Sequence, residues 1–191
     1  MGDGVSATGA ARLGPGWLRG VTHCPSPNCD PRPEGEVVRL VVVHAISLPP
    51  DTFGGPGVEQ LFTNTLPVGA HPYYAGIAGL RVSAHFFIRR DGRVVQFVPV
   101  RLRAWHAGLS VWRGRERCND FSIGIELEGC DSQPFTAVQY RRLTRLIRRL
   151  QRHFPIEDIV GHADIAPGRK TDPGPHFNWQ RLRQGLRRRS R

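Results

Sequence analysis

The stretch GHADIAPGRKTDPGP, residues 161–175, places a histidine, a lysine and two aspartates among glycines and prolines. Its His162 and Asp172, together with the distant His44, offer two imidazoles and one carboxylate. This donor set suits an ion such as Zn²⁺, and three protein ligands leave a fourth position for water, as in hydrolytic sites. A Gly- and Pro-rich loop would let His162 and Asp172 converge on one ion. Taken singly, each is more simply explained as an ordinary polar loop residue, so the metal site depends on the set.

Lys170 is the only lysine among the 27 Lys and Arg residues of the chain. At solvated positions Arg replaces Lys readily, so a retained lysine indicates a place where a compact ammonium, or one able to lose its proton, is needed. Chance is the alternative explanation. The position of Lys170 between two candidate ligands favours a function.

Two predicted strands would position the site. EVVRLVVVHA, residues 36–45, is a β-branched run typical of a strand buried on both faces, and it puts His44 at the carboxyl end beside a loop. FSIGIELEG, residues 121–129, alternates, so Glu126 lies on the face opposite to Ile123, Ile125 and Leu127.

Other patterns predict the remaining elements. We expect a short helix over 58–64, a hairpin over 83–99 that turns at Asp91-Gly92, and an amphipathic helix from Thr136 to about Phe154 with Thr136 as N-cap. A last amphipathic turn or helix follows at 177–186. Strands mixed with helices indicate a single α/β domain with a mixed sheet.

The 191 residues are enough for one domain, and a Gly-rich lead at 1–15 is expected to be disordered, with a basic tail at 181–191. The net charge of +11 suits anionic partners in general. A specific nucleic-acid binder is not expected, because no aromatic side chains are interleaved with the basic runs.

The N-terminal residues contain no apolar stretch of signal length, and no segment approaches a membrane span. We therefore expect a cytoplasmic protein without membrane contact, whose four cysteines are free thiols.

Five strings carry a family resemblance: VVVHAISLPPDTFGG, LRVSAHFFIRRDG, AWHAG, GRERCNDFSIGIELEG and GHADIAPGRKTDPGP. They closely resemble the zinc-dependent N-acetylmuramoyl-L-alanine amidases, which include an amidase of bacterial cell-wall recycling, phage amidases and peptidoglycan recognition proteins. The resemblance runs from about Gly16 to Trp179. It implies a mixed β-sheet flanked by helices, with residues 16–180 as the zinc amidase domain.

The resemblance also implies roles for particular residues. The zinc ligands would be His44, His162 and Asp172, and the catalytic pair would be Glu126 and Lys170. Arg81 and Arg117 would contact the acidic stem peptide, while Trp105 and His106 would lie near the substrate cleft. The substrate would be a muropeptide, cleaved between the lactyl group of (1,6-anhydro)N-acetylmuramic acid and L-alanine.

Two other functions fit the same resemblance: an amidase of broader specificity for muramyl peptides, and a muropeptide-binding module without turnover. The chain departs from the family at Ala45, where relatives often carry asparagine. Of the remaining polar residues, His85 is expected to be a buried, hydrogen-bonded imidazole and Asp164 a cap. His106 is open between substrate contact and a structural hydrogen bond.

Overall fold

The computed structural model describes residues 15–187, so the expected disordered lead lies outside the described residues except for residue 15. Its centre is a six-stranded sheet in the order β1-β5-β4-β9-β3-β10. The strands are β1 (Thr22–His23), β5 (Val94–Gln96), β4 (Phe86–Ile88), β9 (Ser122–Glu128), β3 (Leu40–Ile46) and β10 (Asp158–Gly161). Only the β4–β5 pair is antiparallel among these neighbours, which confirms a mixed sheet.

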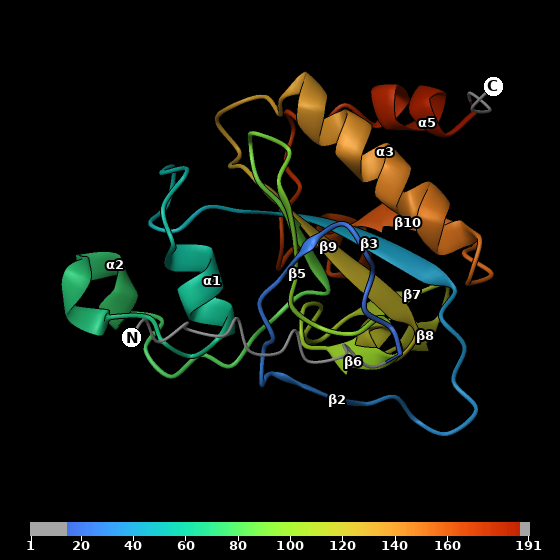
Figure 1. The fold of residues 1–191 in the computed structure, drawn as a ribbon, viewed down its shortest axis with the longest axis horizontal. Coiled ribbons are helices and arrows are strands. Elements are labelled where there is room, and N and C mark those ends of the chain that lie inside the picture. Colours follow the sequence, from blue (N-terminus) through green and yellow to red (C-terminus); the bar gives the residue numbers. More distant parts are fainter. Residues whose placement is uncertain (1–14, 188–191) are drawn as a thin grey trace, which may run out of the picture.

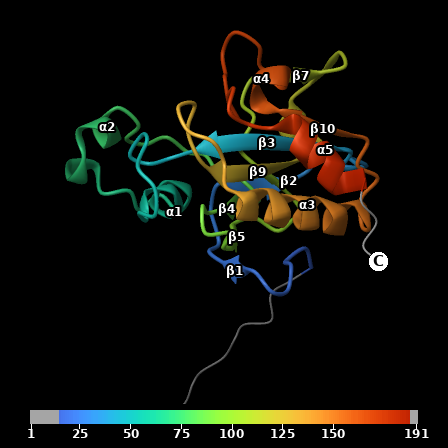
Figure 2. The same ribbon diagram turned by 90° about the horizontal axis from the view of Figure 1, so that it is seen from above.

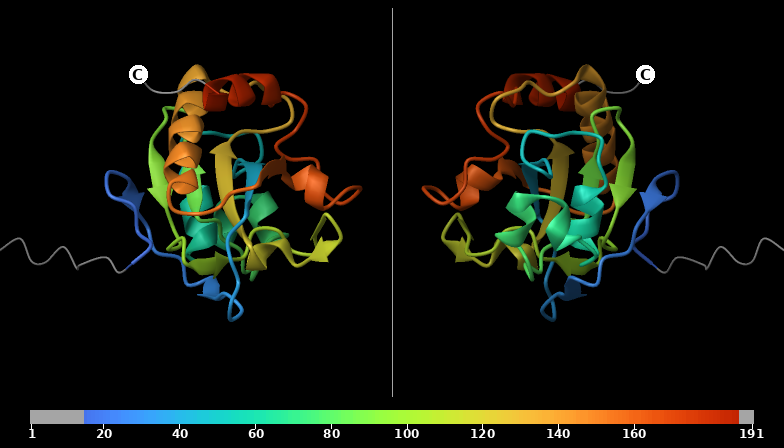
Figure 3. Two further views of the ribbon diagram at one scale, coloured as in Figure 1. Left: turned by 90° about the vertical axis from the view of Figure 1, so that its right-hand side faces the viewer. Right: turned by 90° about the vertical axis from the view of Figure 1, so that its left-hand side faces the viewer.

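Side-chain alternation in β3 and β9 divides the sheet into two faces. The odd-numbered residues of both strands pack against helix α3 (Ala137–Gln151) in one core cluster. The strands contribute Val41, Val43, Ile123, Ile125 and Leu127, and the helix contributes Leu143 and Ile147. The even-numbered residues, including His44 and Glu126, point to the opposite face. Figure 3 shows the two faces from the ends, with α3 on one side and the short helix α4 (His162–Ile165) on the other.

Helix α3 begins where the sequence predicts. Thr136 is its N-cap and forms a capping box with Gln139, and the arginines in the last turn, Arg148 and Arg149, suit the helix dipole. Helix α5 (Trp179–Arg187) lies beside α3 (Figure 1), and its Leu182 is buried in the same core. Helix α5 thus crosses the expected boundary at residue 180, and Leu182 of the expected basic tail packs in the core.

The predicted hairpin is confirmed: β4 and β5 pair across a turn in which Gly92 has a φ of +85°. The predicted short helix is α1 (Gly57–Phe62). In Figure 2 the arrowhead of β3 points toward α1 and α2, so the carboxyl end of β3 faces these two helices. The smaller elements are β2 (Cys29–Pro31), β6 (Leu102–Ala104), β7 (Val111–Trp112), β8 (Arg115–Glu116), the 3₁₀ helices η1 (Val68–Ala70) and η2 (Cys118–Asp120), and α2 (Pro72–Ala75).

All four cysteines fall within the described residues and are free thiols, as expected. Between residues 15 and 187, no helix combines the length and the apolar character that crossing a bilayer requires.

Candidate metal centre and active site

Neighbouring strands bring the two candidate metal-binding histidines together. In the parallel register of β3 and β10, Val43 lies opposite Gly161, so the next residues, His44 and His162, emerge side by side. His162 is the first residue of α4 and not a loop residue as the sequence suggested. The chain then returns Asp172 to the same point, where its carbonyl accepts a hydrogen bond from the Ala163 N–H at 2.9 Å.

The three candidate ligand atoms form a nearly equilateral triangle. His44 Nδ1 is 3.0 Å from His162 Nδ1, and each of these nitrogens is 3.1 Å from Asp172 Oδ2. Tetrahedral zinc with bonds of about 2.0–2.1 Å holds neighbouring ligand atoms about 3.3 Å apart. The triangle therefore has the dimensions of three zinc ligands. Within residues 15–187, His44, His162 and Asp172 form a group that could hold a metal ion.

The chemistry of these atoms also fits a cation. His162 Nε2 is 3.1 Å from the carbonyl oxygen of Ala107, which can only accept, so the hydrogen of a neutral His162 ring is on Nε2. Its Nδ1 then points a lone pair into the triangle, toward an Asp172 oxygen that also carries lone pairs. A cation at this point would relieve the convergence of electron pairs.

Burial keeps His44 in the form that binds metals. The side chains of His44 and His162 are 1% and 5% exposed. Burial lowers the pKa of His44 to about 4, which leaves the ring neutral at physiological pH. Neutral imidazole is the form that binds metals.

Glu126 is a buried carboxylate beside this triangle. It lies opposite His44 in the register of β9 and β3. Burial, followed by the negative charge of Asp172, raises the pKa of Glu126 well above its usual value. Its Oε2 is buried and has no hydrogen-bond partner within residues 15–187. An unpartnered carboxylate with a raised pKa has the properties of a general acid or base.

A cavity of about 510 Å³ opens onto the triangle. It is lined by all three candidate ligands and also by Glu126, Lys170, Trp105, His106 and Ala45. The sequence did not predict its apolar wall, to which α1, α2 and the segment after α2 contribute Leu61, Phe62, Tyr73, Ile77 and Leu80. Leu61 and Phe62 lie in the predicted short helix, but no periodic pattern marks Tyr73, Ile77 and Leu80, because they come from a four-residue helix and the loop after it.

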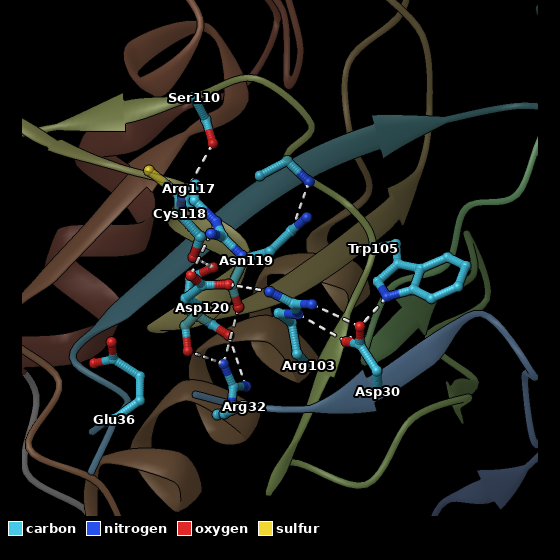
Figure 4. Close-up of polar contacts among 12 residues, drawn as sticks. Asp30, Arg32, Glu36, Arg103, Trp105, Ser110, Arg117, Cys118, Asn119 and Asp120 are labelled. Atoms are coloured by element: carbon cyan, nitrogen blue, oxygen red, sulfur yellow. Dashed lines mark hydrogen bonds and ion pairs between the residues drawn. The ribbon is translucent and has the colours of Figure 1, made fainter. Parts of the chain in front are cut away.

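Trp105 is held by ionic neighbours. Its indole N–H donates to Asp30, whose carboxylate also pairs with Arg103, and Arg103 bridges Asp30 and Asp120 (Figure 4). Hydrogen bonds from Arg103 lower the pKa of Asp30. The hydrogen bond to the Asp30 carboxylate therefore fixes the position of the Trp105 indole in the lining of the cavity.

Arg81 and Arg117 lie elsewhere. Arg81 lines an adjoining cavity of about 240 Å³, and neither arginine is among the residues that line the 510 Å³ cavity. Arg117 is in the left-handed region, with a φ of +59°, and pairs with Asp120 at 3.3 Å. The structure does not bring either arginine to the metal centre.

Three other polar residues have structural partners. His85 is fully buried; its Nδ1 accepts from the Gly124 N–H and its Nε2 lies 3.0 Å from the Leu102 carbonyl, as predicted. Asp164 caps α4 through the Gly161 N–H, also as predicted. His106 makes structural hydrogen bonds through both ring nitrogens while lining the cavity.

Residues 34–175 match the family model described as N-acetylmuramoyl-L-alanine amidase, and the chain belongs to this family. Within the family it is similar to the 1,6-anhydro-N-acetylmuramyl-L-alanine amidase AmpD of Escherichia coli K12. The two are 57% identical over 170 residues, which cover 88% of this chain and 93% of that protein. The resemblance drawn from the sequence motifs is thus confirmed.

Solved structures agree with this assignment. A crystal structure of a selenomethionine derivative of AmpD matches with a TM-score of 0.88 and 56% identity, covering 91% of this chain and 98% of that one. The amidase AmiD from E. coli, in complex with anhydro-N-acetylmuramic acid-L-Ala-D-γ-Glu-L-Lys, matches with a TM-score of 0.57 and 32% identity. That match covers 81% of this chain and 60% of AmiD. The expected fold class and enzyme class are therefore both confirmed.

Proposed function

We propose that this amidase hydrolyses the bond between the lactyl group of 1,6-anhydro-N-acetylmuramic acid and L-alanine in muropeptides, with zinc as its cofactor. The observation that carries the proposal is the triangle of His44, His162 and Asp172 at the floor of a cavity, in a chain 57% identical to an amidase named for that substrate. The complex of AmiD with an anhydro-muramyl peptide supports the same substrate class.

His44, His162 and Asp172 would hold the zinc ion. When bound in such a site, zinc polarises a carbonyl and makes water acidic enough to lose a proton near neutral pH.

Glu126 would accept the proton of the attacking water and deliver it to the leaving amine of L-alanine. Both tasks require a carboxyl group that exchanges protons near neutral pH, and the raised pKa of Glu126 supports this role. The unpartnered Oε2 leaves one carboxylate oxygen available for the transfer.

Lys170 would stabilise the oxyanion that forms when the lactyl carbonyl is attacked. It lines the same cavity as Glu126, and its charge lowers the pKa of Glu126 against the larger effect of burial. A compact ammonium at this position adds a positive charge where negative charge develops, and one well-placed donor is worth roughly 3 kcal/mol.

Substrate contacts would come from Trp105 and the edge of His106 inside the cavity. Arg81 and Arg117 would meet the acidic stem peptide only where it extends beyond the cavity. We further propose that the enzyme works in the cytoplasm on recycled muropeptides, as the family resemblance of its motifs implies.

The test compares the chelator-treated protein with the same protein after zinc is restored. Anhydro-muropeptide should be split into sugar and free stem peptide by the zinc-loaded protein only. Undiminished turnover by protein verified to be metal-free would contradict the zinc proposal. Comparable rates on reducing-end muropeptides would replace the anhydro substrate by the broader specificity, and tight binding without product would favour a binding module.

A further inference from the structure

Two consecutive residues behind the metal centre contact both candidate histidine ligands. The segment 105–108 follows β6 and runs beneath His44 and His162. His106 Nδ1 is 3.0 Å from His44 Nε2, and the carbonyl oxygen of Ala107 is 3.1 Å from His162 Nε2. In each ligand histidine, Nδ1 therefore belongs to the triangle and Nε2 contacts this segment.

The direction of the hydrogen bond to His44 follows from the groups behind it. The Cys118 carbonyl can only accept, so the Ser122 hydroxyl, 2.5 Å away, donates to it. The oxygen of Ser122 is left to accept from His106 Nε2, which is 3.2 Å away.

The same reasoning continues toward the metal centre. A neutral His106 that carries its hydrogen on Nε2 can only accept on Nδ1, the nitrogen that lies 3.0 Å from His44 Nε2. His44 Nε2 is then the donor to His106. The lone pair of His44 is therefore on Nδ1, the nitrogen that points into the triangle.

Several side chains hold this segment: Ser83 accepts from the Trp105 N–H, Arg169 donates to the Ala107 carbonyl, and Asn119 binds the two residues that contact the ligands. Asn119, in η2, accepts with its Oδ1 from the N–H of His106 at 3.1 Å and from the N–H of Ala107 at 2.8 Å. The backbone carbonyl of Asn119 is in turn fixed by Arg32, 3.0 Å away (Figure 4).

Strand β9 makes room for the imidazole of His106. A Cβ atom on Gly124 would lie 2.4 Å from His106 Cγ, closer than any side chain tolerates. The ring is thus confined between the sheet and the segment that Asn119 holds.

We propose that Asn119, which lines neither the triangle nor the cavity, is a positioning residue of the metal centre. By clamping His106 and Ala107, it fixes the tautomer in which both ligand histidines direct Nδ1 to the metal. This inference rests on the zinc site of the proposed function and adds a role for residues outside the ligand set. Partners of this kind hold the ring orientation of metal-binding histidines, and their loss typically weakens metal affinity about 10–100-fold.

The tautomer of His106 can be read directly. Long-range ¹H–¹⁵N correlation of the histidine rings in the zinc-loaded wild-type protein should show the ring hydrogen of His106 on Nε2. A hydrogen on Nδ1 would reverse the chain of hydrogen bonds and overturn the inference, whatever the behaviour of any variant.

Zinc affinity tests the clamp. In competition with a chromophoric chelator, Asn119→Ala should bind Zn²⁺ about 10–100-fold more weakly than wild type. Asn119→Asp keeps a side-chain oxygen for both N–H groups and should stay close to wild type. Asn178→Ala is the matched control, because Asn178 Oδ1 accepts the Arg181 N–H at the start of α5 and should not affect zinc.

The outcomes separate the two proposals. If the wild-type protein binds no zinc, or binds it equally well without His44, the proposed function fails. If wild type binds one zinc ion and a folded Asn119→Ala binds it as tightly, only the positioning role of Asn119 is overturned. Weakened binding by Asn119→Ala, with recovery in Asn119→Asp and wild-type zinc affinity in Asn178→Ala, supports it, since Asn178→Ala also loses a side-chain hydrogen bond but far from the metal centre.

Discussion

His44 and Glu126 lie opposite each other on the neighbouring parallel strands β3 and β9. Both point to the face of the sheet away from α3, and both line the same cavity. The sheet itself therefore fixes the distance between a candidate metal ligand and the candidate proton carrier, without relying on a loop. This arrangement gives catalytic groups the rigid support that their geometry requires.

Replacing Glu126 by glutamine should separate metal binding from turnover. Glu126→Gln keeps the shape of the side chain but cannot exchange the proton, so kcat should fall by roughly 10²–10⁴-fold. Zinc content, measured by metal analysis of the same preparation, should remain that of wild type because Glu126 is not in the triangle. A variant with wild-type kcat would remove Glu126 from the mechanism.

Lys170 variants test why the chain's one lysine stands here. Lys170→Met removes the charge from the cavity, and we expect kcat to drop by about 10²–10³-fold. Lys170→Arg restores a permanent charge on a larger, planar group, so its kcat should fall between those of wild type and Lys170→Met. Steady-state kinetics on anhydro-muropeptide measure both; an Arg variant as fast as wild type would mean that charge alone suffices.

Because Gly124 lies so close to His106, adding a single methyl group at residue 124 should lower the stability of the fold. Gly124→Ala would force the His106 ring to move, and overpacking of this kind costs about 1–3 kcal/mol of stability. Zinc affinity should fall as well, since His106 contacts His44. Gly55→Ala is the control: a Cβ on Gly55 meets nothing within 4 Å, so neither the free energy of unfolding nor the zinc affinity should change comparably.

His85 should make the fold sensitive to acid. Burial, with repulsion from Arg32, lowers the pKa of His85 to about 3. In the unfolded chain the pKa of a histidine is about 6.5. Between these values the unfolded state binds a proton that the folded state does not. Stability therefore decreases as the pH falls through this window, by up to about 1.4 kcal/mol per pH unit for this group.

Urea unfolding of wild type and His85→Asn over the upper part of that window measures the effect. Asparagine does not titrate and keeps an acceptor for the Gly124 N–H, so the variant's free energy of unfolding should depend less steeply on pH. Equal slopes would show that His85 does not supply the acid sensitivity.

Much of the site could be predicted from local sequence patterns. The apolar run that ends at His44 and the alternation around Glu126 place each residue on a strand and on a face, because these properties depend on a few neighbouring residues. The pairing of β3 with β10, which sets His44 beside His162, could not be predicted in this way. Strand order depends on long-range packing, and no local pattern records it.

The hydrogen-bonding role of Asn119 was also beyond local patterns. Asn119 lies in a one-turn helix, and its partners are backbone N–H groups more than ten residues earlier in the chain. Family resemblance alone supplied Arg81, Arg117, Trp105 and His106 as substrate contacts. The structure places Trp105 and His106 in the cavity lining but not the two arginines, and the roles of all four in substrate binding remain predictions.

The position of β10 at the edge of the sheet has a mechanical consequence. His44 belongs to an inner strand and His162 directly follows the edge strand, so an ion held by both would act as a crosslink between the rim of the sheet and its interior. Edge strands otherwise open more readily than central ones. Loading the metal should therefore slow amide hydrogen exchange in β10 more than in β9, which is already enclosed by strands on both sides.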